Sequence, residues 1–274
     1  MGTESTDRTA DSELRKTCEA GTLRLYGTDS AANVRERLEH ELALIEELGW
    51  ARGFLTVLAT VRAIRDIGVP IGSTPGSSAG SFAYYVLGVT DVDPLEHDLL
   101  FERFLLEHDG VLKFTVDIPF RRLNLVAAAL GAPPVSTSVC RIEADGVTIG
   151  IRGLEVLDRN EATLAKVSAE GGPVLRLADI PADDPQTYDL LCSGSNFGAY
   201  WFDTLSARRM LRDLHPRTLD QLAVAFAINR SYFPAQAQAQ DLMKRVRGRT
   251  WGLGARHSPT SRAQRAASSS SRSR

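Results

Sequence analysis

The chain carries its most informative stretch at Val69-Pro-Ile-Gly-Ser-Thr-Pro-Gly-Ser-Ser-Ala-Gly-Ser81. Glycine and proline end the preceding helical pattern there, and a new helix is expected from about Ser77 through Val86. A Gly/Ser-rich loop that opens into a helix presents backbone N–H groups and hydroxyls that can bind phosphate. The alternative role for a serine at such a position is helix capping. The candidate phosphate-binding residues of the loop are Gly76, Ser77, Gly80 and Ser81.

Apolar residues at helical spacing predict helices on both sides of this loop. In the N-terminal half, helices are expected over residues 12–26, 33–48 and 54–67, and from Pro94 to Phe104. Asn33 and Glu36 read as a capping box for the second of them. Further along, helices are expected over residues 120–130, 184–191, 204–214 and 219–228. Asp184 before a proline is the expected N-cap of the helix over 184–191.

Strand signals are confined to the middle of the chain. Residues 111–118 alternate loosely, and two short β-rich runs flank Asp145-Gly146, a hairpin signal. The sequence therefore predicts an α+β fold that is mostly helical. Its expected organisation is a disordered leader, a first domain, a helical region and a basic Ser/Arg-rich disordered tail, at residues 1–11, 12–178, 179–243 and 244–274.

Composition indicates a globular protein of one large domain or two small ones. The 274 residues are 43% hydrophobic and 24% charged, and no apolar run reaches the length of a membrane span. The three cysteines are far apart and odd in number, so we expect no disulfide framework and a cytoplasmic location. We expect no membrane partner.

Charge is distributed unevenly along the chain. Nine of the 32 Lys and Arg residues lie in residues 242–274 without an acid, which leaves 23 bases against 34 acids elsewhere. Because Lys and Arg dominate contacts to nucleic-acid phosphates, the acidic body does not look like a surface built for a long duplex. The tail supplies such charge, although its low complexity favours disorder.

Several phrases beyond the loop, in conserved order and spacing, resemble the alpha subunit of bacterial DNA polymerase III, the family C polymerase. They are Arg37-Leu-Glu-His-Glu-Leu, Leu100-Phe-Glu-Arg-Phe104, Asp179-Ile-Pro-Ala-Asp-Asp-Pro and Arg208-Arg-Met-Leu-Arg-Asp-Leu-His-Pro216. The resemblance covers the family's palm and early fingers. It implies that residues 12–178 form a remnant of a nucleotidyltransferase-like (polymerase beta-like) palm and residues 179–243 part of the helical fingers. It also implies a role in DNA replication or repair.

The acids that hold two Mg²⁺ ions in this family are mostly missing. The family writes Pro-Asp-Phe-Asp-Val-Asp-Phe where this chain has Leu112-Lys-Phe-Thr-Val-Asp-Ile118, so Lys113 and Thr115 replace two acids and Asp117 remains. A further family acid aligns with Gly150. Mg²⁺ prefers anionic oxygen ligands, and one carboxylate does not hold two ions. The resemblance therefore implies a truncated, degenerate relative without polymerase activity of its own, a pseudoenzyme.

Two retained residues are candidates for the remaining chemistry. Asp117 is the residual catalytic and metal-binding candidate, and its alternative roles are capping the next helix or pairing with Arg121 or Arg122. Arg230 matches a nucleotide-side arginine of the fingers, and its alternative role is that of a surface arginine.

Three hypotheses for function stay open. The first is an inactive accessory protein that binds primer–template DNA, a nucleoside triphosphate or replisome proteins. The second is an active nucleotidyltransferase with an altered Mg²⁺ site, which clustering of Asp117 with Asp91, Asp93, Asp145 or Glu155 would favour. The third is a protein-binding scaffold. Mg²⁺ is the expected cofactor if activity is retained, and none is expected otherwise.

Overall fold

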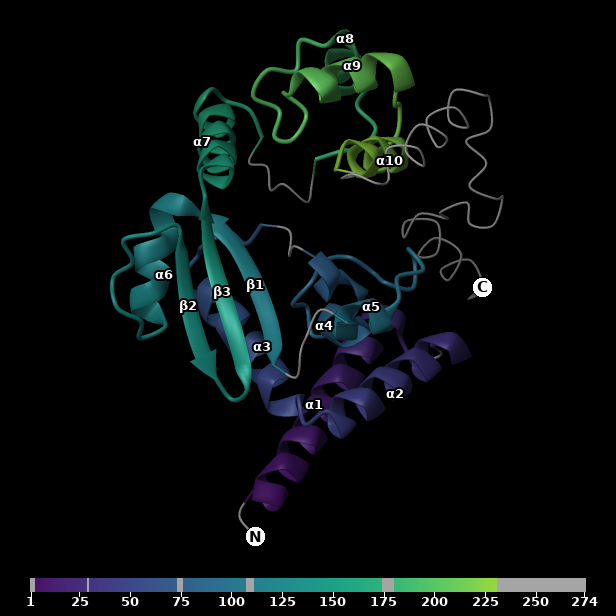
Figure 1. Cartoon of the computed structure of the whole chain (residues 1–274), viewed down its shortest axis with the longest axis vertical. Coiled ribbons are helices and arrows are strands. Elements are labelled where there is room, and N and C mark those ends of the chain that lie inside the picture. The colour runs from purple at the N-terminus through teal and green to yellow at the C-terminus, as the bar shows by residue number, and fades with distance from the viewer. Residues whose placement is uncertain (1–2, 29, 73–75, 107–110, 174–179, 231–274) are drawn as a thin grey trace, which may run out of the picture. The chain divides into compact units, whose positions relative to one another are not determined.

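The computed structural model of the chain describes residues 3–28, 30–72, 76–106, 111–173 and 180–230 (Figure 1). Contacts divide the chain into two compact units, Met1–Val174 and Leu175–Arg274. This division falls close to the expected boundary at residue 178. The structure is mostly helical with one small sheet, as the sequence predicts for an α+β fold. The basic tail expected over 244–274 lies outside the described residues.

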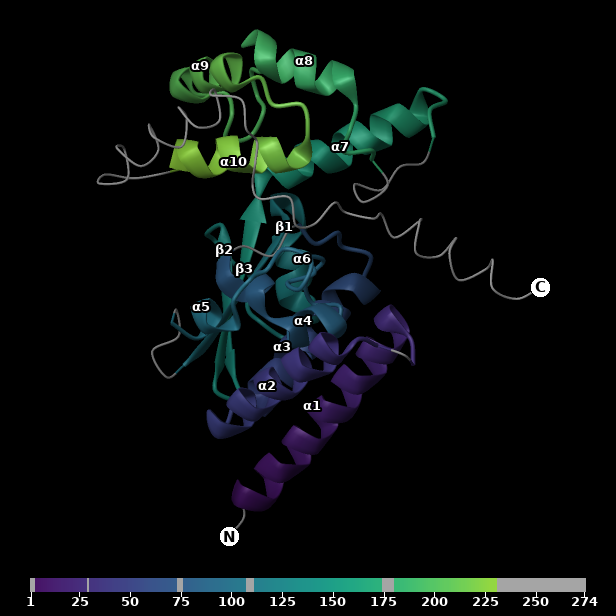
Figure 2. The same cartoon turned by 90° about the vertical axis from the view of Figure 1, so that its right-hand side faces the viewer.

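Three long helices open the first unit, and Figure 2 shows α1 and α2 side by side. They are α1 (Thr3–Tyr26), α2 (Ala32–Glu47) and α3 (Ala51–Asp66). Helix α1 begins nine residues before the expected start, so the leader predicted over 1–11 is helical from Thr3 onward. Ala10 of this added helical part packs into the core one turn before Leu14.

The Gly/Ser stretch forms two short helices in place of the single predicted one. A 3₁₀ helix covers Gly76–Gly80, and α4 (Phe82–Val86) follows after Ser81. The helix expected from Pro94 is a turn, and α5 (Phe101–Leu106) begins seven residues later. The predicted capping box at Asn33 is wrong, because α2 begins at Ala32 and its N-cap, Ala31, makes no side-chain cap.

Three strands form one mixed sheet, in the order β1-β3-β2. They are β1 (Leu112–Pro119), β2 (Val139–Ala144) and β3 (Val147–Leu154). Strand β3 pairs parallel with β1 and antiparallel with β2, and the turn between β2 and β3 confirms the hairpin predicted at Asp145-Gly146. The chain crosses from β1 to β2 through a 3₁₀ turn and α6 (Leu123–Ala129).

Helices cover one face of this sheet. Helices α3 and α6 contact the strands and each other, and Figure 1 shows α3 behind β1. Buried apolar residues of β1 and β3 face them, starting with Leu112 and Val147, which lie beside Gly53 of α3. Aromatic side chains join the helices to this core, with the rings of Phe54 and Tyr84 stacked 4.2 Å apart. Helix α7 (Glu155–Ala169) continues directly from β3.

In residues 180–230, the described part of the second unit, the three helices expected over 184–191, 204–214 and 219–228 are confirmed. They are α8 (Pro185–Ser193), α9 (Leu205–Leu214) and α10 (Leu219–Arg230). Asp184 is confirmed as the N-cap of α8, accepting a hydrogen bond of 2.9 Å from the Thr187 amide. A small separate core packs the three helices together, with members Leu191, Met210, Leu211, Leu214, Ala225 and Ile228. Among the described helices, none is both long enough and apolar enough to span a membrane.

Helix α1 approaches α4 closely at Gly21. A Cβ at this position would lie 2.1 Å from the carbonyl oxygen of Val86, a backbone atom that cannot rotate away. We predict that Gly21→Ala lowers the free energy of unfolding by about 1–3 kcal/mol through overpacking. This loss would occur although alanine favours an isolated helix over glycine by about 1 kcal/mol. Urea denaturation measures the change.

Glu19→Ala is the matched control, because Glu19 is an exposed residue of the same helix. We expect it to change the free energy of unfolding by less than about 0.5 kcal/mol. A Gly21→Ala variant as stable as this control would show that the close contact between α1 and α4 is wrong.

Candidate functional site

The described serines of the Gly/Ser stretch, Ser77, Ser78 and Ser81, are buried. Ser77 is 7% exposed and Ser81 is fully buried. The Ser81 hydroxyl accepts a hydrogen bond of 3.2 Å from the Tyr84 amide, so Ser81 is the N-cap of α4. It also donates to Oε2 of Glu41, at 3.1 Å. Ser81 thus has the capping role that the sequence offered as its alternative.

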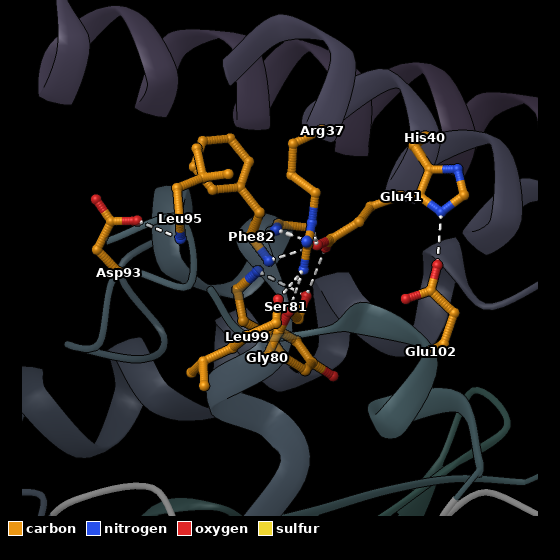
Figure 3. Close-up of polar contacts among 12 residues, drawn as sticks. Arg37, His40, Glu41, Gly80, Ser81, Phe82, Asp93, Leu95, Leu99 and Glu102 are labelled. Carbon is orange, nitrogen blue, oxygen red and sulfur yellow. Dashed lines mark hydrogen bonds and ion pairs between the residues drawn. The ribbon is translucent and has the colours of Figure 1, made fainter. Parts of the chain in front are cut away.

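Glu41, a residue of α2, lies at the N-terminus of α4 (Figure 3). Its carboxylate accepts hydrogen bonds from the amides of Phe82 and Ala83, at 2.8 and 3.0 Å. It also forms an ion pair with Arg37, whose Nε lies 2.6 Å from Oε1. The side chain is fully buried. Burial raises the pKa of Glu41 above its ordinary value, against the bonds from Ala83, Phe82 and Arg37 that lower it. The N–H groups that would meet a phosphate at this helix end already bind an internal carboxylate.

Arg37 extends this network to the rest of the stretch. Its Nη2 donates to the carbonyl oxygens of Gly80 and Leu99, at 2.7 and 3.0 Å. Gly80 has no space for a side chain, because a Cβ there would lie 2.8 Å from the Leu100 carbonyl oxygen. The network therefore holds Gly80 and the start of α4 in place through internal hydrogen bonds. Phosphate binding by Gly76, Ser77, Gly80 and Ser81 stays a prediction.

Asp117 lies near the C-terminal end of β1, where its side chain is 9% exposed. It binds Arg152 of β3 in a two-pronged ion pair, with Nε–Oδ1 at 2.7 Å and Nη2–Oδ2 at 2.9 Å. The Asp117 carbonyl also accepts from the Gly72 amide at 2.8 Å, which joins the Gly/Ser stretch to the strand. Because both carboxylate oxygens are engaged, the side chain is held by arginine.

The expected pairing of Asp117 with Arg121 or Arg122 is wrong. The Arg121 amide binds Asp158, at 3.1 Å, and the Arg122 guanidinium pairs with Glu161, at 3.0 Å. Both arginines follow the strand in a 3₁₀ turn and meet acids of α7. Arg152 is opposite Asp117 in the parallel register, which the sequence alone does not reveal.

The face of the sheet away from α3 and α6 is polar. Strand register places its side chains in three rows of three across β1, β3 and β2. The rows are Lys113–Thr148–Glu143, Thr115–Gly150–Arg141 and Asp117–Arg152–Val139. We call this set the polar sheet face. A Cβ on Gly150 would lie 3.8 Å from Thr115 Oγ1, which confirms that these two residues share the face and leaves room above the glycine.

Two of the four acids named with Asp117 in the second hypothesis, Asp93 and Asp145, have other partners. Asp93 caps the turn before α5 through the Leu95 amide, at 2.9 Å, and bonds the Tyr26 hydroxyl. Asp145 accepts from Thr56 Oγ1, at 2.7 Å. Within the described residues, no group of three or more His, Cys, Asp or Glu side chains is placed to hold a metal ion. The donors around Asp117 do not fit a pair of Mg²⁺ ions.

Arg230 is the last residue of α10 and belongs to the second unit. Its backbone is described and its side chain lies outside the described part of the chain. Its match to a nucleotide-side arginine stays a prediction.

Sequence reasoning missed two residues of this region. Glu41 binds the first amides of α4, and Arg152 binds the carboxylate of Asp117. Glu41 carried a signal, since it interrupts the apolar stripe of α2 and follows Arg37 by four residues, the spacing of a helical ion pair. Arg152 carried none, because its partner lies 35 residues away and meets it only through strand pairing.

Comparison with known proteins finds two family matches along the chain, and the second begins within the first unit, just before α7. Residues 12–122 match the bacterial DNA polymerase III alpha NTPase domain, and residues 154–252 match the bacterial DNA polymerase III alpha subunit finger domain. The chain belongs to the family of the bacterial DNA polymerase III alpha subunit. Residues 123–153, which contain β2 and nearly all of β3, lie between the two matches.

Curated relatives agree with this assignment and are much longer than the matched part of this chain. DNA polymerase III subunit alpha of Escherichia coli (strain K12) is 53% identical over 92 residues, 33% of this chain and 8% of the relative. The Halalkalibacterium halodurans subunit is 46% identical over 99 residues, 36% of this chain and 9% of the relative. The Thermotoga maritima subunit is 26% identical over 258 residues, 71% of this chain and 30% of the relative.

The Glu41 network should contribute strongly to the free energy of unfolding. We predict that Glu41→Ala lowers the free energy of unfolding by about 3–5 kcal/mol, because it leaves Arg37 and the first amides of α4 unpaired in the interior. Glu41→Gln, which keeps the shape and one acceptor, should cost less. Thermal and urea unfolding measure both.

Glu39→Ala is the matched control on the same helix. Glu39 pairs with Arg15 at 2.7 Å, but its side chain is 59% exposed, so its removal should cost less than about 1 kcal/mol. Equal effects of Glu41→Ala and Glu39→Ala would contradict the role of Glu41.

Proposed function

We propose that this protein is a replication-associated relative of the DNA polymerase III alpha subunit whose palm-like unit does not catalyse nucleotidyl transfer. The observation that carries the proposal is the polar sheet face. Lys113, Thr115 and Gly150 stand there where the family pattern places acids, and Asp117 is bound by Arg152. Such a face lacks the carboxylates that metal-assisted phosphoryl transfer requires.

The geometry supports the alignment of Gly150 with a family acid. Acids that hold the same pair of metal ions must converge on one spot, and Gly150 lies beside Thr115 on neighbouring parallel strands. This placement agrees with the sequence alignment although residues 123–153 lie between the two family matches. The register of β1 with β3 therefore supports, together with the sequence, the proposal that this unit retains a nucleotidyltransferase-like palm.

Lys113 provides no metal ligand, and its positive charge also repels a metal ion. At about 5 Å an ammonium repels a divalent cation by about 2 kcal/mol in a water-like dielectric and by about 7 kcal/mol at an effective constant of 20. Lys113 is exposed, so the lower figure is the closer one. Added to the missing ligands, this repulsion argues against a metal pair at the sheet.

The proposed role is that of an accessory which contacts primer–template DNA, a nucleoside triphosphate or replisome proteins. The family assignment supports a place among these molecules. The internally bonded start of α4 and the two hydrophobic cores support a scaffold that keeps its shape without the reaction.

Primer extension on the purified chain, with Mg²⁺ or Mn²⁺, tests the proposal. We expect no extension from the natural chain or from Asp117→Ala. Extension by the natural chain that disappears in Asp117→Ala would overturn the proposal and establish an altered metal site.

Restoring the acids provides the converse test. We predict that the triple variant Lys113→Asp, Thr115→Asp, Gly150→Asp gains saturable Mn²⁺ binding, seen by electron paramagnetic resonance, because it returns carboxylates to adjacent positions of one face. A Cβ at position 150 would make only ordinary van der Waals contact, 3.8 Å from Thr115 Oγ1. The control is Arg62→Asp, an exposed position on α3 that covers the opposite face of the sheet. A triple variant that binds no more Mn²⁺ than this control would show that these three positions do not form the site.

A further inference from the structure

Strand β2 is an edge strand of the sheet, since β3 lies on one side of it and no described strand lies on the other (Figure 1). It belongs to residues 123–153, the segment between the two family matches. An edge strand presents N–H and C=O groups that can pair with a further strand. The register of the hairpin identifies these groups on β2.

Backbone groups of β2 alternate between the inner and the outer side of the strand. The two-residue turn makes Ala144 and Val147 a hydrogen-bonded pair, and every second pair of an antiparallel ladder is bonded in this way. At the other end of the strand, the Ser138 carbonyl accepts from the Gly153 amide at 2.8 Å, in the same alternation. The even-numbered residues of β2 therefore bond to β3, and the amides and carbonyls of the odd-numbered residues point to the open side.

Thr137 closes one end of this open side. Its hydroxyl donates to the Val139 carbonyl at 3.0 Å and accepts from the Val139 amide at 3.4 Å. Arg141 and Glu143 are the next odd-numbered residues, and both are exposed. Among the residues that the structure describes, none bonds to the backbone of these two outside the sheet ladder. The amides and carbonyls of Arg141 and Glu143 are thus available to a further strand.

The side chains of Arg141 and Glu143 carry opposite charges on the polar sheet face. On β3 they lie opposite Gly150 and Thr148, neither of which is charged. The ion pairs formed within the described part of the chain include neither side chain. The edge of β2 therefore presents one positive and one negative group, each able to accept a partner of opposite charge.

These charges favour one way of pairing β2 with the same strand of a second copy. In an antiparallel pair centred on Ile142, Arg141 of each copy lies opposite Glu143 of the other, and both are positions whose backbone groups point to the open side. The half-buried side chains of the two Ile142 residues would meet at the centre, on the face that packs against the core. A pair centred on Arg141 or on Glu143 would place like charges directly opposite each other, which destabilises a sheet.

We propose that β2 binds β2 of a second copy of this chain, antiparallel and centred on Ile142, so that the three-stranded sheet continues from one copy into the other. Each copy contributes the amides and carbonyls of Arg141 and Glu143, and each Arg141 pairs with a Glu143. A contact limited to a strand edge buries less than the roughly 1,200 Å² of a standard interface. The association is therefore weak and depends on concentration.

Sedimentation equilibrium of the full-length chain over a range of concentrations tests the proposal. We expect a reversible equilibrium between monomer and dimer, and slower hydrogen exchange of the Arg141 and Glu143 amides as the concentration rises. The single variants Arg141→Glu and Glu143→Arg each place like charges opposite each other. Each should weaken association about tenfold or more.

A mixture of the two single variants tests the register itself. One variant carries glutamate at both positions and the other carries arginine at both, so a mixed dimer has opposite charges at every pair. We expect dimers in the mixture and not in either variant alone at the same concentration. The double variant Arg141→Glu, Glu143→Arg should associate like the natural chain. Arg62→Glu, at an exposed position of α3, is the matched charge reversal and should leave association unchanged.

A natural chain that stays monomeric at every concentration would overturn the proposal. So would association that both single variants keep, because another surface would then be responsible, and so would a mixture of the folded single variants that forms no dimer. Unchanged exchange of the two amides in a dimeric natural chain would overturn it without any variant. Primer extension reports on nucleotidyl transfer and not on association, so failure here is distinguishable from failure of the proposed function.

Discussion

The buried carboxylate of Glu41 is the interaction on which the architecture of the first unit depends. It joins α2 to the start of α4 through two backbone amides, and through Arg37 it fixes two carbonyls of the adjoining loops. A charge in this position is costly to bury, so it persists only with complete hydrogen bonding. The network holds the start of α4 in place, and Tyr84 of this helix stacks on Phe54 in the aromatic core.

The same principle explains why the scaffold tolerates different side chains on the polar sheet face. The elements that determine the fold make their key contacts within the protein. Ser81 caps α4, and Glu41 binds the amides at the N-terminus of α4. Helices α3 and α6 cover the apolar face of the sheet. None of these contacts uses the polar sheet face. Substitutions such as Lys113 and Thr115 therefore change its chemistry at little cost to packing, because these side chains point away from the core.

Local signals in the sequence predicted most elements and few of their contacts. The hairpin at Asp145-Gly146 and the cap at Asp184 were predictable because each depends on adjacent residues. The start of α1 was not predictable, because it depends on the packing of Ala10 in the core. The absence of a cap at Asn33 was not predictable either, because α2 already begins at Ala32. The candidate acid Asp117 was found by alignment. Its partner Arg152 depends on the pairing of β1 with β3, which no local pattern encodes.

Retention of Asp117 has a structural explanation that needs no catalytic role. The Asp117–Arg152 pair joins the neighbouring strands β1 and β3 near the ends of both, and the aspartate side chain is largely buried. Removing one partner of such a pair leaves the other charge without compensation, whereas Lys113 and Thr115 occupy more open positions of the same strand. Selection for stability alone would then keep the one acid with an internal partner. The presence of Asp117 on this face is therefore evidence of strand pairing before it is evidence of chemistry.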